Sequence, residues 1–277
     1  MERFVILDGS GFAHRALHAR GGPKPARRFF ETVLRTVGRL DPSYLAIALD
    51  GPREDLVRRA MYDGYKAQRP PVDLEVRVLF QKLWQTCREL GMATVGCKGW
   101  EADDVIGTLA QWSSDEVEAI MVSADKDLAQ LVRPGVRLYD IATSSFVGED
   151  DIRQKFGVRP DQIAAYLAIV GDRVDGIPGL PGMGPKAAQK LLKRYDSLEG
   201  IQSEGVWDGG SASVAGSRYD DLALWADLTR IRTDLDLRVS ASDLEFNGLD
   251  LKNARNSLAH FKVTGLVRSF GLQSPYP

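Results

Sequence analysis

The stretch Arg3-Phe-Val-Ile-Leu-Asp8 decides the fold, because a short apolar run with the composition of a buried strand ends directly on a carboxylate. Two further apolar runs end in the same way: Tyr44-Leu-Ala-Ile-Ala-Leu49 before Asp50, and Ala119-Ile-Met-Val-Ser123 before Asp125 and Asp127. Short continuous apolar runs are consistent with buried parallel strands, and open α/β sheets bind ligands outside the carboxyl ends of their strands. The pattern therefore predicts a sheet with acids gathered at one edge.

Helical patterns alternate with these runs, which is typical of an α/β fold. The predicted elements are a helix over Ala26–Leu40, an amphipathic helix over Leu74–Leu90, a strand around Met92–Val95, a helix from about Asp103 and a strand over 117–122. We read residues 1–50 as strand, helix, strand. From residue 150 onward the sequence is mostly helical, and the Gly/Ser-rich segment 203–217 is typical of a flexible loop.

Nine acids stand at five places along the chain. They are Asp8, Asp50, Glu101, Asp103, Asp104, Asp125, Asp127, Asp172 and Asp175. Converging carboxylates form a hard-oxygen site that suits Mg²⁺ or Mn²⁺ and not zinc. Glu101 and Asp103 can reach one metal only if Glu101 precedes the helix, because they would otherwise lie on nearly opposite faces. For any single Asp, a cap or a solvated surface position is an equally good interpretation.

Two metal ions at such a site can activate a water and stabilise the leaving oxygen of a phosphodiester. One ion lowers the pKa of its bound water, which becomes the nucleophile, and the other neutralises charge at the departing 3′ oxygen. The chain has only three histidines, His14, His18 and His260, and offers no Ser/His/Asp or Cys/His apparatus.

Composition and charge agree with a soluble nucleic-acid enzyme. The chain has 277 residues, 44% hydrophobic and 27% charged, enough for one large domain or two unequal ones. There are 36 Lys and Arg against 38 Asp and Glu, so setting the nine acids aside leaves an excess of seven cations for phosphates. No apolar run has the length of a membrane span, and no signal peptide precedes the first strand, so we expect a cytoplasmic protein. Cys87 and Cys97 predict reduced, partly buried thiols.

Two segments are candidates for DNA binding. The hairpin Gly176-Ile-Pro-Gly-Leu-Pro-Gly-Met-Gly-Pro-Lys186 lies between helical stretches, and the amides after Gly182 and Gly184 can hold a phosphate, with Lys186 adding charge. The stretch Tyr62-Asp-Gly-Tyr-Lys-Ala-Gln-Arg69 joins aromatics such as Tyr65 to cations, which suits stacking on a single strand. Taken alone, that stretch is also typical of a solvated face.

Seven motifs occur in order between about residue 3 and residue 240. They are Leu7-Asp-Gly9, Tyr65-Lys-Ala-Gln-Arg-Pro-Pro71, Glu101-Ala-Asp-Asp104, Ser123-Ala-Asp-Lys-Asp-Leu128, Gly171-Asp172 with Asp175, the hairpin to Lys186, and Ile231-Arg-Thr-Asp-Leu235. Each alone is weak, but the ordered series is specific. It resembles the bacterial and phage 5′-nuclease (flap endonuclease) family, which includes the N-terminal domain of DNA polymerase I and free-standing exonuclease IX-type proteins.

The resemblance implies an α/β fold with a mixed, mainly parallel central sheet flanked by helices, similar to PIN domains. It implies a catalytic region over 1–158 with a helical arch over about 52–90. It also implies a mainly helical region over 159–277 with a helix–three-turn–helix and a helix–hairpin–helix-like motif over about 165–195. The implied activity is Mg²⁺- or Mn²⁺-dependent hydrolysis of 5′ flaps and 5′ ends by a monomer in DNA replication and repair.

By position, the resemblance also assigns roles to residues. Asp8, Asp50, Glu101, Asp103 and Asp104 fall on the first metal cluster, and Asp125, Asp127, Asp172 and Asp175 on the second. Lys66 and Arg69 match arch cations that act on the scissile phosphate, Arg15 a basic position near the site, and Lys186 a duplex contact. Backbone oxygens around Val174–Pro178 could hold K⁺.

Two departures from the family pattern stand near the site. Gly176 replaces the usual Asn before Ile-Pro-Gly, which predicts a looser turn, and Asp50 is followed by Gly-Pro. Because all the expected acids are present, we favour an active nuclease over an inert branched-DNA-binding protein. A PIN-type ribonuclease is disfavoured by the arch and the hairpin.

Overall fold

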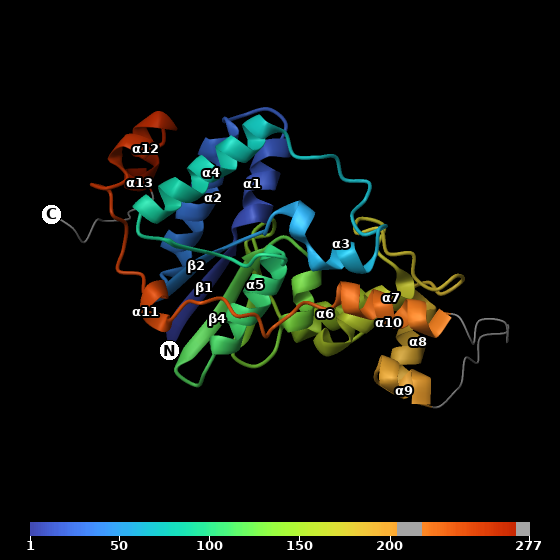
Figure 1. Cartoon of the computed structure of the whole chain (residues 1–277). Helices are drawn as coiled ribbons and strands as arrows, with labels where there is room; N and C mark the ends of the chain where they lie inside the picture. The colour runs from blue at the N-terminus through green and yellow to red at the C-terminus, as the bar shows by residue number, and fades with distance from the viewer. Residues whose placement is uncertain (204–217, 270–277) are drawn as a thin grey trace.

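The computed structural model describes residues 1–203 and 218–269, and its centre is a six-stranded sheet in the order β3-β2-β1-β4-β5-β6 (Figure 1). The strands are β1 (Glu2–Asp8), β2 (Tyr44–Leu49), β3 (Ala93–Gly96), β4 (Val117–Ser123), β5 (Val136–Asp140) and β6 (Ser145–Val147). Neighbouring strands run parallel except β5 and β6. The expected mixed, mainly parallel sheet is therefore confirmed.

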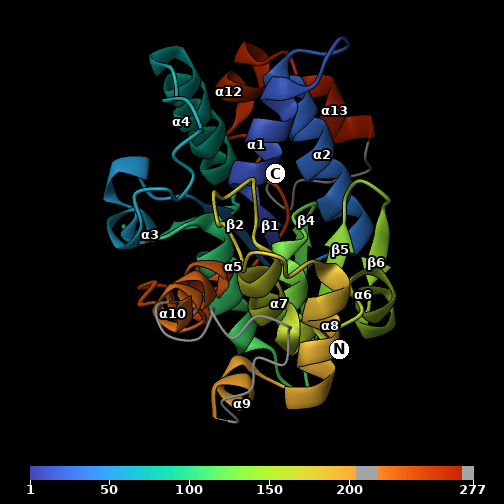
Figure 2. The same ribbon diagram turned by 90° about the vertical axis from the view of Figure 1, so that its right-hand side faces the viewer.

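Side chains along β1 point alternately to the two faces of the sheet, and each face has its own layer of the hydrophobic core. Phe4 and Ile6 pack into one hydrophobic cluster, whereas Val5 and Leu7 pack into the other. On the Val5 side lie α1 (Gly9–His18), α2 (Pro25–Leu40), α4 (Leu74–Glu89), α12 (Arg255–His260) and α13 (Thr264–Ser269). On the Phe4 side lies α5 (Ala102–Leu109), followed by the helical region (Figure 2).

The first helix was not foreseen. Residues 1–50 contain two helices between their strands, and α1 begins with Gly-Ser-Gly, which has poor intrinsic helix propensity. The carboxylate of Asp8 compensates, because it caps this helix by accepting the Gly11 N–H at 2.8 Å. The predicted helices at Ala26–Leu40 and Leu74–Leu90 and the strands near 92–95 and 117–122 all form, within one residue of the expected bounds at most ends.

The segment predicted as an arch is only partly helical. It consists of the short turns η1 (Arg53–Asp55) and α3 (Val57–Met61), a non-helical stretch to Asp73, and α4. The last turns of α4 rest on the sheet, since Leu83 and Cys87 are buried. We use "arch segment" below for residues 62–69, which connect α3 to the proline pair before α4.

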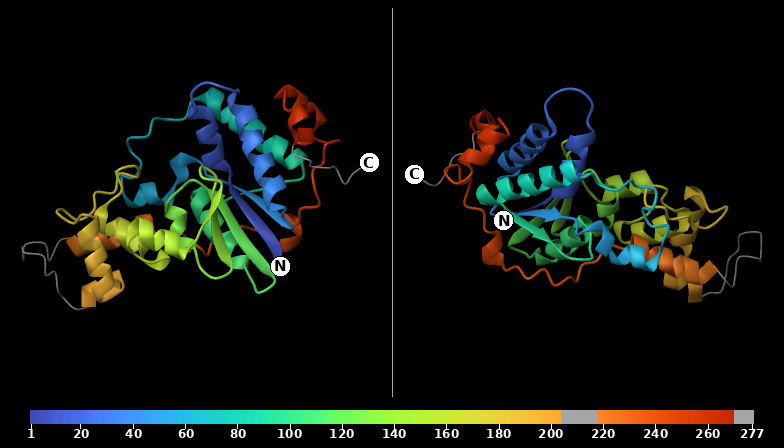
Figure 3. Two further views of the ribbon diagram at one scale, coloured as in Figure 1. Left: turned by 180° about the vertical axis from the view of Figure 1, so that it is seen from behind. Right: turned by 45° about the horizontal axis from the view of Figure 1, so that its top comes forward.

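The remaining helices gather beside one end of the sheet, away from α12 and α13 (Figure 3). They are α6 (Glu149–Phe156), η4 (Pro160–Gln162), α7 (Ile163–Val170), α8 (Pro185–Tyr195), α9 (Leu198–Ser203) and α10 (Arg218–Thr229). The turn η3 (Asp127–Leu131) packs against α7 and η4, while η2 (Ala110–Trp112) and α11 (Ala241–Leu244) lie elsewhere. The hairpin between α7 and α8 is present as expected. Residues 204–217 of the predicted loop lie outside the described residues, and no described helix is long and apolar enough to cross a bilayer.

Candidate active site

Parallel register brings the strand-end acids to one edge of the sheet. Asp8 ends β1, Asp50 follows β2, and Asp125 and Asp127 follow β4, as the sequence predicts. Hydrogen bonds fix two of them: Ser123 Oγ donates to Asp8 Oδ2 at 2.6 Å, and the Ala102 N–H donates to Asp50 Oδ1 at 2.8 Å. Ser123 begins the motif Ser123-Ala-Asp-Lys-Asp-Leu128, but its role in orienting Asp8 was not foreseen.

The start of α5 brings two more acids to this edge. Glu101 is the N-cap residue, so the requirement that it precede the helix is met, and Asp103 lies in the first turn. Acids at a helix N-terminus are favoured by its dipole. Asp172 and Asp175 come from the hairpin loop after α7, which Asp172 and Ile177 close through a pair of backbone hydrogen bonds of 2.8 Å.

Burial and mutual repulsion act on the carboxylates at this edge. Burial raises the pKa of Asp8 to about 6, and nearby Asp50 and Asp125 add to the increase. Burial also raises the pKa of Asp127 to about 7, aided by Asp125, and holds the pKa of Asp103 well above its ordinary value. A carboxyl group that resists ionisation in this way gains from a nearby cation.

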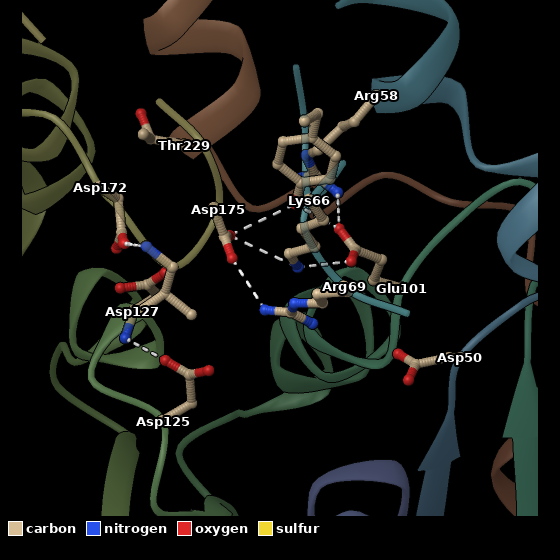
Figure 4. Close-up of polar contacts among 12 residues, drawn as sticks. Asp50, Arg58, Lys66, Arg69, Glu101, Asp125, Asp127, Asp172, Asp175 and Thr229 are labelled. Atoms are coloured by element: carbon tan, nitrogen blue, oxygen red, sulfur yellow. Dashed lines mark hydrogen bonds and ion pairs between the residues drawn. The ribbon is translucent and has the colours of Figure 1, made fainter. Parts of the chain in front are cut away.

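Lysine and arginine side chains supply that charge to the other acids (Figure 4). Lys66 Nζ lies 2.6 Å from Glu101 Oε1 and 3.4 Å from Asp175 Oδ2, and Arg69 lies 2.9 Å from Asp175 Oδ1. Lys126 Nζ lies 2.7 Å from Asp172 Oδ2. Burial alone would raise the pKa of Glu101, but Lys66 and Arg58 hold it below its ordinary value.

Five of the acids and two of the cations line a pocket, whereas Asp8, Asp50 and Asp125 are not part of its lining. Its polar wall comprises Arg58, Tyr65, Lys66, Glu101, Asp103, Asp127, Asp172 and Asp175. Leu228, Thr229 and Ile231 also line it, so the C-terminal end of α10 and the chain just after it close one side of the site.

The donor set fits a divalent cation, although the side chains are not arranged as a metal cage. Over residues 1–203 and 218–269, no three Asp, Glu, His or Cys side chains have the arrangement of a metal site. Lys66 pairs with Glu101 and Asp175, and Lys126 pairs with Asp172. The fit rests on hard oxygen donors with raised pKa values and on Asp127 Oδ1, which is buried and has no hydrogen-bond partner.

Asp104 is a correction to the expected ligand set. Its side chain is 0% exposed and accepts from Arg58 NH1 at 2.6 Å, Arg58 NH2 at 2.7 Å, the Arg232 N–H at 2.9 Å and the Glu101 N–H at 3.1 Å. With its oxygens occupied on all sides, it has a structural role and is not available to a metal. No local pattern pairs Asp104 with Arg58, because the two residues stand 46 positions apart in the chain.

Tyr65 is a second correction. We expected it to stack on single-stranded DNA, but its side chain is 2% exposed and its hydroxyl donates to Glu101 Oε2 at 2.6 Å. Arg58 NH1 donates to the same oxygen at 3.2 Å. Both residues therefore orient Glu101 from within the protein. An aromatic residue beside cations does not reveal in a sequence whether it faces solvent or core.

The other predicted DNA contacts lie on the surface. Gly182, Gly184 and Lys186 are exposed at the start of α8, and a Cβ atom at either glycine would meet nothing within 4 Å, so another backbone can approach closely. Arg15 is exposed on α1, and within the described part of the chain no hydrogen bond or ion pair joins it to the acids. Its proposed role rests on the resemblance alone.

Protein donors already reach several carbonyl oxygens of the hairpin where the resemblance implies K⁺. Gln68 Nε2 donates to the carbonyl oxygens of Val174 at 2.6 Å and Arg173 at 3.2 Å. The Lys66 N–H donates to the carbonyl oxygen of Asp175 at 2.9 Å. A K⁺ ion held around Val174–Pro178 would share the Val174 and Asp175 oxygens with these donors, and the K⁺ site stays a prediction of the resemblance.

Two family models match the chain in tandem. Residues 3–157 match the 5′-3′ exonuclease N-terminal resolvase-like domain, and residues 158–252 match the 5′-3′ exonuclease C-terminal SAM fold. The chain belongs to the 5′-3′ exonuclease family. Members of this family are nucleases, and among its relatives a 5′-3′ exonuclease of Aquifex aeolicus (strain VF5) is 32% identical over 97% of this chain and 95% of that protein.

Other 5′-3′ exonuclease relatives are larger. The thermostable DNA polymerase I of Thermus aquaticus is 32% identical over 99% of this chain but 34% of the polymerase. The DNA polymerase I of Rhizobium leguminosarum is 33% identical over 88% of this chain and 26% of that protein. This chain thus spans about a quarter to a third of these polymerases.

Solved structures share the fold. A bacteriophage T5 flap endonuclease, crystallised as a pseudo-enzyme-product complex with DNA and metal ions, superimposes with a TM-score of 0.71 at 18% identity, covering 94% of this chain and 100% of that one. The catalytic core of Rad2 in complex with DNA substrate superimposes with a TM-score of 0.61 at 13% identity, covering 97% and 92%.

Proposed function

We propose that this nuclease hydrolyses DNA phosphodiesters at 5′ flaps and 5′ ends, close to junctions between single strand and duplex, in DNA replication and repair. The observation that carries the proposal is the edge of the sheet, where carboxylates with raised pKa values meet beneath the cations of the arch segment. Hydrolysis of a phosphodiester uses both groups: the cations would hold its negative charge, and the acids would hold metal ions that activate the attacking water.

Divalent cations, Mg²⁺ or Mn²⁺, would be held in two groups. Asp8, Asp50, Glu101 and Asp103 would hold one, and Asp125, Asp127, Asp172 and Asp175 would hold the other. When bound, these ions would supply an ionised water and neutralise charge at the departing 3′ oxygen. The T5 enzymes that share this fold have been crystallised with metal ions, which supports the proposal.

Side chains of this protein would orient the metal-holding acids and neutralise the charge of the phosphate. Ser123 fixes the carboxylate of Asp8 at the end of β1, and Tyr65 and Arg58 fix that of Glu101 at the pocket. Lys66, whose ammonium lies at the pocket between Glu101 and Asp175, and the exposed Arg69 offer positive charge to a scissile phosphate. Fixed cations that meet developing negative charge stabilise the transition state more than the bound ground state.

The hairpin would bind the duplex. The start of α8 carries no side-chain cap, its glycines are open to an approaching backbone, and Lys186 adds charge. We assign residues 1–158 to a catalytic region and residues 159–277 to a mainly helical region that binds duplex and also contributes Asp172 and Asp175 to the site, in a monomeric, cytoplasmic protein. Contacts to phosphates are independent of sequence, so junction structure and not base identity would select the site.

The test is cleavage of a 5′-labelled flap DNA with Mg²⁺, with Mn²⁺ and with EDTA, with products sized on a gel. Metal-dependent cuts at the junction are the expected result. Tight flap binding without cutting would identify an inert branched-DNA-binding protein, and equal turnover of single-stranded RNA would favour a PIN-type ribonuclease.

A matched pair of variants separates metal binding from DNA binding. Asp125→Asn removes one proposed ligand and should abolish cleavage while leaving flap affinity largely intact. Asp150→Asn neutralises an exposed acid on α6 and should change neither. Loss of flap binding by Asp125→Asn alone would contradict the assignment of separate roles.

A further inference from the structure

The arch segment is fastened to the hairpin by backbone as well as side-chain contacts. Its Lys66 N–H donates to the Asp175 carbonyl at 2.9 Å, and Gln68 Nε2 donates to the Val174 and Arg173 carbonyls. In Figure 1 the loop after α3 runs beside the loop between α7 and α8. These residues are about 106 positions apart in the chain, so the contact is a tertiary one.

Gly176 makes this approach possible. Its φ is +75°, a conformation that side chains rarely adopt, and a Cβ atom there would overlap the backbone oxygen of Gly64. The glycine was expected to loosen the turn. The structure gives it the opposite role, since the absent side chain lets the arch segment pack directly on the hairpin.

The docking fixes the backbone that carries the arch cations. Lys66 itself has φ +50°, and its carbonyl accepts from Arg53 NH2 at 2.9 Å. Gln68, which stands two residues after Lys66 and one before Arg69, is exposed, and within the described part of the chain no hydrogen bond joins its side chain to the acids. Its hydrogen bonds go to the hairpin carbonyls and hold the loop there.

We propose that Gln68 and Gly176 are positioning residues, which hold the arch segment on the hairpin and so place Lys66 and Arg69 over the acids. The inference rests on the proposed function for its catalytic consequence, but the contact itself can be tested without cleavage. It also implies that the carbonyls of Arg173 and Val174 serve the arch segment.

The variants are Gln68→Met, which keeps approximate size without an N–H donor, and Gly176→Ala, which adds the one atom that Gly64 excludes. Gln111→Met is the matched control for the first, since Gln111 Nε2 also donates to a carbonyl, that of Gly107 one helical turn earlier, and Gln111 does not line the pocket. Gly135→Ala is the control for the second, because Gly135 has φ +78° but no contact closer than 3.7 Å for a Cβ atom.

Hydrogen–deuterium exchange of the metal-free protein measures the contact. Peptides covering 62–72 should exchange faster in Gln68→Met and Gly176→Ala than in the wild type, and at the wild-type rate in both controls. Unchanged exchange in both test variants would overturn the proposal.

Single-turnover cleavage of flap DNA measures the consequence. Loss of the Gln68 hydrogen bonds should slow the chemical step roughly three- to tenfold, with DNA affinity measured in EDTA close to that of the wild type. Equal losses in rate and affinity, with exchange unchanged, would make Gln68 a DNA contact and refute a positioning role. If the wild type cleaves no DNA, the proposed function fails, whereas the exchange result still decides whether the contact holds the arch segment.

Discussion

Replacing Asp104 with Asn distinguishes a structural acid from a metal ligand. Asp104 is 0% exposed and Arg58 6% exposed, and they meet through two hydrogen bonds of 2.6 and 2.7 Å. Each Asp104 oxygen accepts from Arg58 and from one backbone N–H, that of Glu101 or that of Arg232. In Asn, one of these oxygens becomes an NH₂ group that faces two donors. Among the described residues, the guanidinium of Arg58 then keeps Glu101 as its acid partner.

The burial of the Asp104–Arg58 pair determines how much free energy of unfolding Asp104→Asn should lose. Removing one partner of a buried ion pair costs roughly 3–5 kcal/mol, because the other charge stays buried without its counterion. That is a large part of the 5–15 kcal/mol by which a typical domain is stable, at roughly 0.05–0.15 kcal/mol per residue. The Glu101 contact at 3.2 Å places the expected loss at about the lower end, near 3 kcal/mol.

The assay is urea denaturation in EDTA, with the free energy of unfolding extrapolated to water. Asp127→Asn is the control, since Asp127 Oδ1 is buried without a partner and its neutralisation should not destabilise the metal-free protein. A loss of less than about 1 kcal/mol in Asp104→Asn, together with loss of the stabilisation by Mg²⁺, would refute the structural role and restore Asp104 as a ligand.

Four further results are expected. Lys66→Ala and Arg69→Ala should slow single-turnover cleavage more than they weaken flap binding in a filter assay, because their charges act mainly in the transition state. Lys186→Ala should weaken duplex binding and lower the slope of log K against log salt by about one, and an unchanged slope would remove Lys186 from the interface. Tyr65→Phe should leave single-strand affinity unchanged in fluorescence titrations, since the ring is buried; a weaker complex would contradict that burial. Because burial raises the pKa of Asp127 from 3.8 to about 7, the folded metal-free protein holds this proton longer than the unfolded chain. Its stability relative to Asp127→Asn should therefore be highest below about pH 4 and fall as pH rises through about 7; thermal melts that stay parallel across this range would contradict the shift.

The sequence was sufficient to predict the edge of the sheet where the acids gather, because apolar runs mark the ends of strands and parallel strands bring their carboxyl ends together. Asp8, Asp50 and the pair after β4 were located in this way. Strands β5 and β6 were not foreseen, and β6 has only three residues, too short for a periodic signal. Helix α1 was missed because its stability comes from the cap and from packing and not from propensity.

Long-range pairing was the part that the sequence could not supply. Arg58 and Lys126 were visible as cations, but their partners Asp104 and Asp172 lie 46 positions along the chain in each case. A pattern of charges predicts that acids need cations without saying which ones. Gly176 was interpreted locally, as a loosened turn, since its neighbour Gly64 comes from a distant segment.

Because several acids of the site pair with lysine and arginine, folding of this protein does not depend on the metal ions proposed for its activity. Ammonium and guanidinium groups already neutralise Glu101, Asp104, Asp172 and Asp175, so the folded state does not need a divalent ion to hold these carboxylates together. Small zinc domains differ, because there the metal supplies the folding energy. Under the proposed function, such a chain would fold and stay intact while free divalent ions are scarce, and it would begin to cleave DNA only when they bind.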